Sequence, residues 1–477
     1  ISGAGNLTKV GSGTLTLSNT NTYSGITTIN NGTISISADN GLGAAPGSVV
    51  ANQLTINGGT LNTSSTFSLA TNRGITIGAN DAIIDVDGST TLSYAGAITG
   101  SGDLTKTGDG TLNLTGSTDF SGSTTIGAGG LGLSDVLPSG TDLTVTGTLN
   151  LLASFTVNTL SGSGNVNLSS YNLTISNGSS SDDTTFSGVI DSTTGRLIKD
   201  GDGTQTLSGT NTYSGTTING GILKVSADAN LGTAPLSTDT DNIILGGGTL
   251  NATASFTLNT NRGITLTENS SINVNSSTTL TYAGVIADNA STYDITKSGS
   301  GSLALSGTHT YDGDTTISAG TIVLTGALNT ATDMIISSGA TWDLQTSQTI
   351  NSLNLDGTIS NGAGSSSLTV TNSSDIGGSI TTSGTQTYTG AVVISAAVTL
   401  TTTDNDVLFS STINGNSGNT DTLTITSGSG DVTFSNTIGA SSAIKALTVT
   451  STGNIYVANN ITTEEGLSDG LYYILFN

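Results

Sequence analysis

The chain repeats one short stretch, which first reads Gly5-Asn6-Leu7-Thr8-Lys9-Val10-Gly11-Ser12-Gly13-Thr14-Leu15-Thr16-Leu17. The stretch returns as Gly102-Asp103-Leu104-Thr105-Lys106-Thr107-Gly108-Asp109-Gly110-Thr111-Leu112, as Leu197-Ile198-Lys199-Asp200-Gly201-Asp202-Gly203, and as Ile295-Thr296-Lys297-Ser298-Gly299-Ser300-Gly301. Counted from Gly11 to Gly108, Gly201 and Gly299, the steps are 97, 93 and 98 residues. Self-similarity at a nearly fixed period is the sequence signature of a repeat architecture.

An aromatic residue, a small residue and a glycine follow each copy, and a Thr-Thr-Ile-like strand comes next. These tripeptides are Tyr23-Ser24-Gly25, Phe120-Ser121-Gly122, Tyr213-Ser214-Gly215 and Tyr311-Asp312-Gly313. A fifth copy at Tyr388-Thr389-Gly390 has lost the lysine and the Gly-x-Gly. We therefore predict one continuous stack of about five repeat units, 1–97, 98–194, 195–290, 291–376 and 377–477, of which the last is degenerate.

A longer period lies above the shorter one. The segment Gly58-Gly59-Thr60-Leu61-Asn62 through Thr71-Asn72-Arg73-Gly74-Ile75-Thr76 recurs after a shift of 189 residues, at 247–251 and 260–265. The repeat units therefore alternate between two types, as expected from the duplication of a pair.

The elements inside a unit are short runs with an apolar residue at every second position, separated by Gly, Asn-Gly or Ser-Gly. Leu15-Leu17, Ile34-Ile36 and Leu143-Val145 are clear pairs of this kind. Such alternation predicts strands with one buried face. A sandwich closes after about seven to nine strands, and a propeller blade repeats near 40–50 residues, so neither fits the period. An all-β solenoid fits it, in the form of an elongated rod of stacked coils.

Composition and charge exclude several classes of function. The 477 residues include 9 Lys and Arg against 33 Asp and Glu, for a net charge of −24. Without a basic patch, binding to nucleic acid or to an anionic membrane surface is disfavoured. The chain has no cysteine, which excludes disulfides and thiolate metal sites. Its apolar runs, such as 471–476, are too short for a membrane-spanning helix, and Ile1 is expected to be an internal or processed start.

The pattern Lys-x-Gly-x-Gly-Thr-Leu, followed by Tyr-x-Gly and a Thr-x-Ile strand, resembles the autotransporter-associated β-strand repeat, also called the passenger-associated transport repeat. The resemblance covers Lys9 to Ile29, Lys106 to Ile126, Lys199 to Ile218 and Lys297 to Ile317. It implies a right-handed, single-stranded parallel β-helix that is exported across a bacterial outer membrane and is extracellular or attached to the cell surface. It also implies that the repeats assist secretion and folding of the passenger.

The residues that define the repeat are interpreted as structural. The Gly-x-Gly pairs suit tight turns, since no third glycine opens a helix and a phosphate site is therefore disfavoured. The lysines are expected to be solvated or to cap the turns, with ligand recognition along a repeating surface as the alternative. These structural residues are Lys9, Gly11, Gly13, Tyr23, Gly25, Lys106, Gly108, Gly110, Phe120, Gly122, Lys199, Gly201, Gly203, Tyr213, Gly215, Lys297, Gly299, Gly301, Tyr311 and Gly313.

The aromatic residues of the repeat are expected to pack inside, because Phe120 takes the place of a tyrosine. Trp342 could be buried or form an exposed contact. His309 is the only histidine and fills the loop position of Asn21 and Asn211, so it is interpreted as a drifted repeat residue and not as a catalytic base. No Ser-His-Asp or Cys-His arrangement is supported.

No cofactor is expected, and only adventitious calcium in loops stays open, because calcium-binding loop patterns are absent. The function predicted from the sequence is a non-enzymatic stalk or adhesin at the bacterial surface. Its partners would be glycans or proteins of a host or another surface, or copies of the chain itself. A self-assembling extracellular fibre, sheath or matrix protein is the first alternative, and a polysaccharide-active β-helix enzyme is the second.

Overall fold

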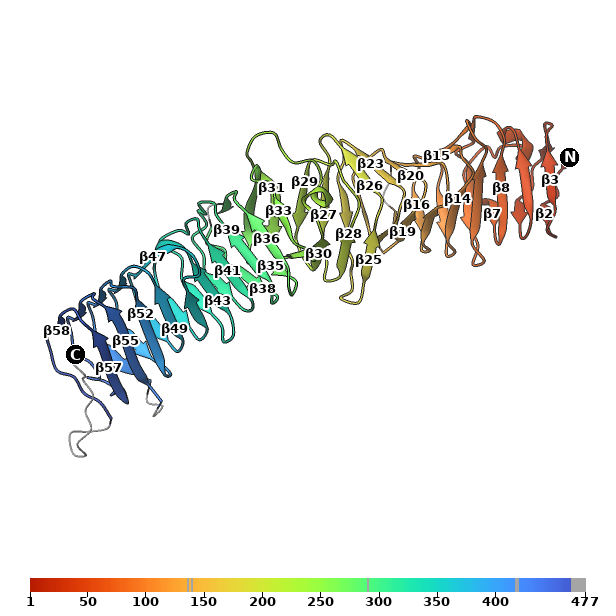
Figure 1. Cartoon of the computed structure of the whole chain (residues 1–477). Coiled ribbons are helices and arrows are strands. Elements are labelled where there is room, and N and C mark those ends of the chain that lie inside the picture. Colours follow the sequence, from red (N-terminus) through yellow and green to blue (C-terminus); the bar gives the residue numbers. More distant parts are fainter. Residues whose placement is uncertain (135–136, 139, 290, 417–419, 465–477) are drawn as a thin grey trace. The chain divides into compact units, whose positions relative to one another are not determined.

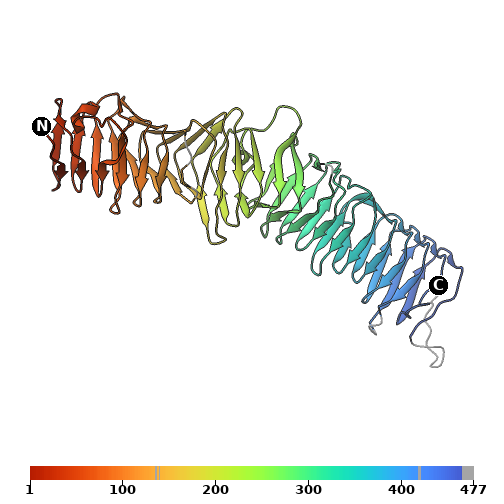
Figure 2. The ribbon, with the colours of Figure 1, turned by 180° about the vertical axis from the view of Figure 1, so that it is seen from behind.

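The computed structural model describes residues 1–134, 137–138, 140–289, 291–416 and 420–464. The apolar run 471–476 lies outside these residues. The chain divides into two compact units, an N-terminal unit of 1–225 with 229–234 and a C-terminal unit of 226–228 with 235–477. Within each unit, short strands from successive coils lie side by side, as Figures 1 and 2 show.

Strand β11 (Ala82–Val86) shows how the coils are joined. It pairs in parallel with β8 (Gly59–Thr63) of the preceding coil and with β14 (Leu104–Thr107) of the following coil. Ile84 lies in register with Leu61 on one side and Lys106 on the other. Alternate residues point inward, so each coil adds one apolar layer to a core that runs along the unit. The predicted all-β parallel solenoid is confirmed.

The N-terminal unit has three strands in a typical coil, on three sheets. Sheet B consists of β2 (Leu7–Lys9), β5 (Thr27–Ile29), β7 (Val50–Ile56), β10 (Arg73–Ile77), β13 (Ile98–Gly100) and β16 (Thr118–Phe120). Sheet C includes β3 (Thr14–Leu17), β6 (Thr33–Ile36), β8, β11, β14, β17 (Thr124–Ile126), β19 (Asp142–Val145) and β22 (Thr159–Gly162). Sheet D consists of β9 (Phe67–Leu69), β12 (Thr91–Tyr94), β15 (Thr111–Leu114), β18 (Gly130–Leu133), β20 (Thr148–Leu151), β23 (Asn165–Ser169) and β26 (Val189–Ser192).

The C-terminal unit is built in the same way. Its longest sheet, sheet F, consists of β33 (Phe256–Leu258), β36 (Thr279–Tyr282), β39 (Ser302–Leu305), β41 (Thr321–Leu324), β43 (Thr341–Leu344), β46 (Thr358–Ser360), β49 (Ser379–Thr382), β52 (Val398–Thr402), β55 (Thr422–Gly428) and β57 (Ala446–Ser451). In a neighbouring sheet, β50 (Gln386–Tyr388), β53 (Val407–Phe409) and β56 (Val432–Phe434) stack their aromatic rings inside the core, with centroids 5.0 and 5.5 Å apart.

Two short 3-10 helices interrupt the strands, at η1 (Asp39–Leu42) and η2 (Asp228–Leu231). Strand alternation alone did not predict them. They begin at aspartates 189 residues apart, which matches the longer period of the sequence.

Successive repeats do not place equivalent strands on the same sheet. The lysine-bearing strand is β2 of sheet B in the first repeat and β14 of sheet C in the second. From β2, four coils lead through β5, β7 and β10 to β13, and β14 is the next strand after β13. The 97-residue step is therefore four coils and one strand. Equivalent strands of the first two repeats thus lie on different sheets, which gives a structural reason for the alternation of unit types. The division of the chain into five repeat units stays a prediction.

Candidate functional site

The four repeat lysines lie in the core, where they replace an inward-pointing aliphatic residue. Lys106 is in register with Ile84 and Ile126 of the neighbouring coils and is fully buried. Its Nζ donates hydrogen bonds to the carbonyl oxygens of Thr107 (2.6 Å), Gly108 (2.7 Å) and a residue of the next coil (3.3 Å). The same three-carbonyl arrangement surrounds Lys9, Lys199 and Lys297.

Burial lowers the pKa of Lys106, Lys199 and Lys297 to about 8, so each ammonium remains charged at neutral pH. A charged ammonium has three N–H groups, one for each carbonyl that surrounds it. The lysines therefore cap the turns and tie each turn to the next coil. Of the two expectations, turn capping agrees with this geometry and solvation does not, because the aliphatic stems fill a core position.

The repeat glycines solve two separate steric problems. The first glycine of each Gly-x-Gly has φ between +65° and +76°, a region that disfavours side chains. In the second, third and fourth repeats, the second glycine packs against the preceding coil: a Cβ on Gly110 would lie 2.3 Å from the carbonyl oxygen of Asp87. The glycine after the aromatic residue is equally crowded, with 2.2 Å between a Cβ on Gly122 and the oxygen of Gly102.

The repeat aromatics are buried, and the tyrosines among them hydrogen-bond to threonine. Tyr23 Oη lies 2.7 Å from the hydroxyl of Thr27, and the corresponding pairs in the third and fourth repeats are 3.1 and 2.6 Å apart. In the second repeat, Phe120 has no hydroxyl, and Thr124 Oγ1 is buried without a hydrogen-bond partner. The second repeat therefore lacks the tyrosine–threonine hydrogen bond that the other three repeats make.

His309 and Trp342 are also buried, at 1% and 0% exposure. His309 Nδ1 accepts a hydrogen bond from the amide of Ile286, as Asn211 Oδ1 does from the amide of Ile190. The histidine thus keeps the acceptor role of the asparagine that it replaces. Its burial excludes contact with a substrate at the surface, and Trp342 packs in the core of sheet F.

Two buried arginines form clamps that sequence reasoning missed. Arg73 binds Asp39 at the start of η1 through two bonds, Nε to Oδ1 at 3.1 Å and a terminal nitrogen to Oδ2 at 3.2 Å. Arg262 binds Asp228 at the start of η2 in the same bidentate way. The sequence did contain a signal for these pairs, because the aspartate and the arginine both recur after 189 residues. Each arginine is thus held by a bidentate, charge-assisted pair, and Arg73 also donates to the carbonyl oxygens of Leu42 and Gly43 at the end of η1.

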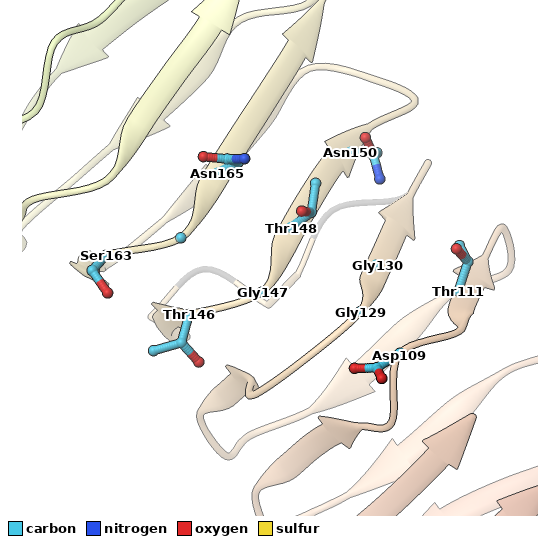
Figure 3. Close-up of a pocket in the computed structure, with 11 residues that line it drawn as sticks. Asp109, Thr111, Gly129, Gly130, Thr146, Gly147, Thr148, Asn150, Ser163 and Asn165 are labelled. Atoms are coloured by element: carbon cyan, nitrogen blue, oxygen red, sulfur yellow. The ribbon is translucent and has the colours of Figure 1, made fainter. Parts of the chain in front are cut away.

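A polar groove crosses the outer surface of sheet D in the N-terminal unit, as Figure 3 shows. Gly129 and Gly130, at the start of strand β18, form part of its floor, while the second outward glycine of this strand, Gly132, lies outside the groove lining. Gly130 lies in register between Thr111 of β15 and Thr148 of β20, whose side chains rise on either side. The cavity volume is about 600 Å³, and the lining residues are Asp109, Thr111, Gly129, Gly130, Thr146, Gly147, Thr148, Asn150, Ser163, Gly164 and Asn165.

Two amides lie close to the glycines of β18: Asn150 lines the groove, and the Asn113 side chain covers Gly132. A Cβ on Gly132 would lie 2.4 Å from Asn113 Oδ1, and a Cβ on Gly130 would lie 3.6 Å from Asn150 Nδ2. Across the described part of the chain, neither amide group makes an internal hydrogen bond. The groove therefore presents both donors and acceptors to a ligand, with Asp109 as the charged residue of its lining.

The glycine floor distinguishes the second repeat from its siblings. In the other repeats, the outward positions that correspond to Gly130 and Gly132 carry side chains. These are Thr33 and Ser35, Ile222 and Lys224, and Thr321 and Val323. Sequence reasoning missed this difference, although the run Gly-Leu-Gly-Leu at 130–133 was the signal. The hollow depends on what the neighbouring coils place beside it, which the linear pattern does not give.

The groove lining contains no recognisable set of catalytic residues. No histidine, lysine or cysteine lines it, and its single carboxylate lacks a second acid or base. Within the described residues, no group of three or more His, Cys, Asp or Glu side chains is placed to hold a metal ion. The same residues include no helix that is long and apolar enough to cross a membrane.

The comparisons with known proteins agree with the repeat geometry. The family Passenger-associated-transport-repeat matches residues 7–36, 104–133, 197–225 and 295–324. The chain is 34% identical over 339 residues to a protein named Adhesin BmaC autotransporter from Brucella suis biovar 1 (strain 1330). That match covers 62% of this chain and 10% of the adhesin, so the chain spans about a tenth of this relative's length. No solved structure matches the chain significantly.

The matched segments coincide with the lysine caps, the glycine turns and the buried aromatics described above. The groove strand β18 lies at the end of the second matched segment. The four matched repeats and the similarity to an autotransporter adhesin indicate an extracellular passenger that is displayed at the cell surface.

Proposed function

We propose that the chain is a non-enzymatic adhesive stalk, and that the groove on sheet D is a point of contact with a ligand. The glycine floor of β18 carries this proposal. The four repeats use their lysines, glycines and aromatics to build coils, whereas Gly130 and Gly132 remove side chains from an outward surface. Glycine in a strand interior costs about 0.5–1 kcal/mol relative to alanine, so the hollow is obtained at a cost in stability.

The ligand chemistry follows from the lining. Amides, hydroxyls and one carboxylate suit an uncharged polar ligand, such as a short stretch of glycan or of peptide backbone. An anionic ligand is disfavoured by Asp109 and by the net charge of −24. The name of the Brucella relative, an adhesin, is consistent with a binding role.

Filling the groove tests this proposal. The double variant Gly130→Thr with Gly132→Ser restores the residues found at these positions in the first repeat. Neither glycine has a positive φ, so the backbone conformation suits both side chains, and a side chain at Gly132 requires only that the Asn113 amide, 2.4 Å from the new Cβ, moves aside. A matched control, Thr33→Ser with Ser35→Thr on β6, changes outward side chains without filling a hollow.

Binding of the full chain to immobilised neutral glycans and to host-cell layers is the measurement. We expect the filled variant to bind at least about tenfold more weakly while the control binds like the wild type. Equal binding by the filled variant would remove the groove from the proposal. If the wild type bound nothing, the adhesive role would be rejected, and turnover of a glycan would reject the non-enzymatic role.

A further inference from the structure

The outer surface of sheet F in the C-terminal unit carries a regular array of hydroxyl groups. Five consecutive strands, β46, β49, β52, β55 and β57, each present two outward Ser or Thr residues, two positions apart. We call these ten residues the hydroxyl face: Thr358, Ser360, Ser379, Thr381, Thr399, Thr401, Thr424, Thr426, Thr448 and Thr450.

The strand register aligns these residues in two straight columns. Thr399 pairs with Thr424 and Thr401 pairs with Thr426, and the adjoining strands continue both columns. Along a column, neighbours are one coil apart, about 4.8 Å, and within a row they are two residues apart, about 6.7 Å. The alternate residues point inward and are buried, such as Leu400. The hydroxyl face is therefore a flat, two-dimensional lattice.

The strands of the hydroxyl face carry no charged residue, and the hydroxyls make no hydrogen bonds within the described residues. None of its five strands contains Asp, Glu, Lys or Arg, although the chain as a whole has a net charge of −24. Throughout the described residues, none of the ten side-chain hydroxyls makes a hydrogen bond. By contrast, outward Thr76 in the single threonine column of sheet B bonds to the carbonyl oxygen of Ala51. The hydroxyl face thus offers many free donors and acceptors in fixed positions.

Threonine suits a preorganised binding surface. Its β-branched side chain is stiff at χ1, so little rotamer entropy is lost on binding. Each threonine also presents a methyl group beside its hydroxyl, which allows contact with both the C–H and the O–H groups of a sugar. Because the face is flat, a small ligand would bury little surface on it. A long, flat ligand could contact several rows at once and gain affinity from multivalency.

We infer that the hydroxyl face binds the flat surface of an insoluble neutral polysaccharide made of extended chains. Charge complementarity supports this choice: an uncharged face on an acidic molecule accepts a neutral polymer and disfavours an anionic one. The inference rests on the proposed adhesive function but uses a different unit and a different surface from the groove. The groove suits a short stretch of glycan or peptide, whereas the hydroxyl face suits the surface of a long polymer.

Sedimentation of the full chain with microcrystalline cellulose and with chitin particles tests the inference. The variant Thr399→Val/Thr401→Val/Thr424→Val/Thr426→Val removes four hydroxyls and keeps the β-branched shape. We expect it to bind at least about tenfold more weakly. The same four positions changed to Ser keep the hydroxyls and should retain most of the binding.

A control variant changes the single threonine column of sheet B, Thr28, Thr55, Thr76 and Thr99, to Val and should bind like the wild type. The groove variant Gly130→Thr/Gly132→Ser should also bind particles normally, which separates this inference from the proposed function. Failure of the wild type to bind either particle, or undiminished binding by the four-valine variant, would overturn the inference. So would ice-growth inhibition or self-association that the four-valine variant abolishes, because the lattice would then face water or a second copy.

Discussion

Replacing Phe120 by tyrosine should stabilise the second repeat. Thr124 Oγ1 is buried without a partner, and in the sibling repeats a tyrosine hydroxyl lies 2.6 to 3.1 Å from the equivalent threonine. A new hydrogen bond contributes about 1 kcal/mol, and an unsatisfied buried hydroxyl costs about 1–3 kcal/mol. Overpacking opposes this gain, but the siblings accommodate the same ring and hydroxyl. We expect a net stabilisation of about 1–2 kcal/mol.

Hydrogen exchange of the amides in β16 and β17 is the suitable assay, because coils of a solenoid need not unfold as one cooperative unit. A gain of 1–2 kcal/mol corresponds to protection factors about 5 to 30 times higher for these amides. The reciprocal change Tyr311→Phe should lower protection around β40 (Thr315–Ile317) by a similar factor.

The double variant Phe120→Tyr/Thr124→Val isolates the new bond. If the gain survives there, the hydroxyl pair is not its source. Unchanged or faster exchange in Phe120→Tyr itself would refute the reasoning, since it would mean that Thr124 is already satisfied or that the ring has no room.

Two further predictions concern buried sites. Burial lowers the pKa of His309 to about 4 in the folded state, from an ordinary 6.5, so the unfolded chain binds its proton first. The contribution of His309 to stability should therefore fall by about 3 kcal/mol from pH 7 to pH 4. The variant His309→Asn, which restores the residue found at Asn211, should lose this part of the acid sensitivity in urea titrations, and parallel pH profiles would contradict the assignment. Gly108→Ala should destabilise more than Gly339→Ala: both glycines have φ above +70°, but a Cβ on Gly108 would lie 2.2 Å from Val86 O and one on Gly339 meets nothing within 4 Å. Gly339→Ala should cost about 1–2 kcal/mol for its backbone alone. Equal losses of amide protection in the strands beside the two glycines would exclude the clash as the cause.

The linear pattern determined the kind of fold because it is local. Alternating apolar residues such as Leu15 and Leu17 specify which face of a strand is buried, and glycines at fixed offsets specify where the chain turns. The period then requires that coils stack. The same logic predicted that Tyr23 and its counterparts pack inside.

The burial of the lysines was within reach of the sequence, although only their turn-capping role was predicted. In Leu104-Thr105-Lys106, the lysine occupies the next inward position after the leucine, so strict alternation places it in the core. The sequence pattern left solvation and turn capping both open. Only the structure showed that carbonyl oxygens from two coils converge on the ammonium and compensate for that cost.

The sequence by itself determined that this chain is a parallel β-solenoid of passenger-associated transport repeats, because strand alternation and turn chemistry are properties of neighbouring residues. Only the tertiary structure decided which outward residues lie beside one another. Gly130 lies beside Thr111 and Thr148, and Thr399 lies beside Thr424, although these neighbours are about 18 to 25 positions apart in the sequence. The coil length sets that register, and it varies from coil to coil, so surface sites emerge only when the coils are stacked.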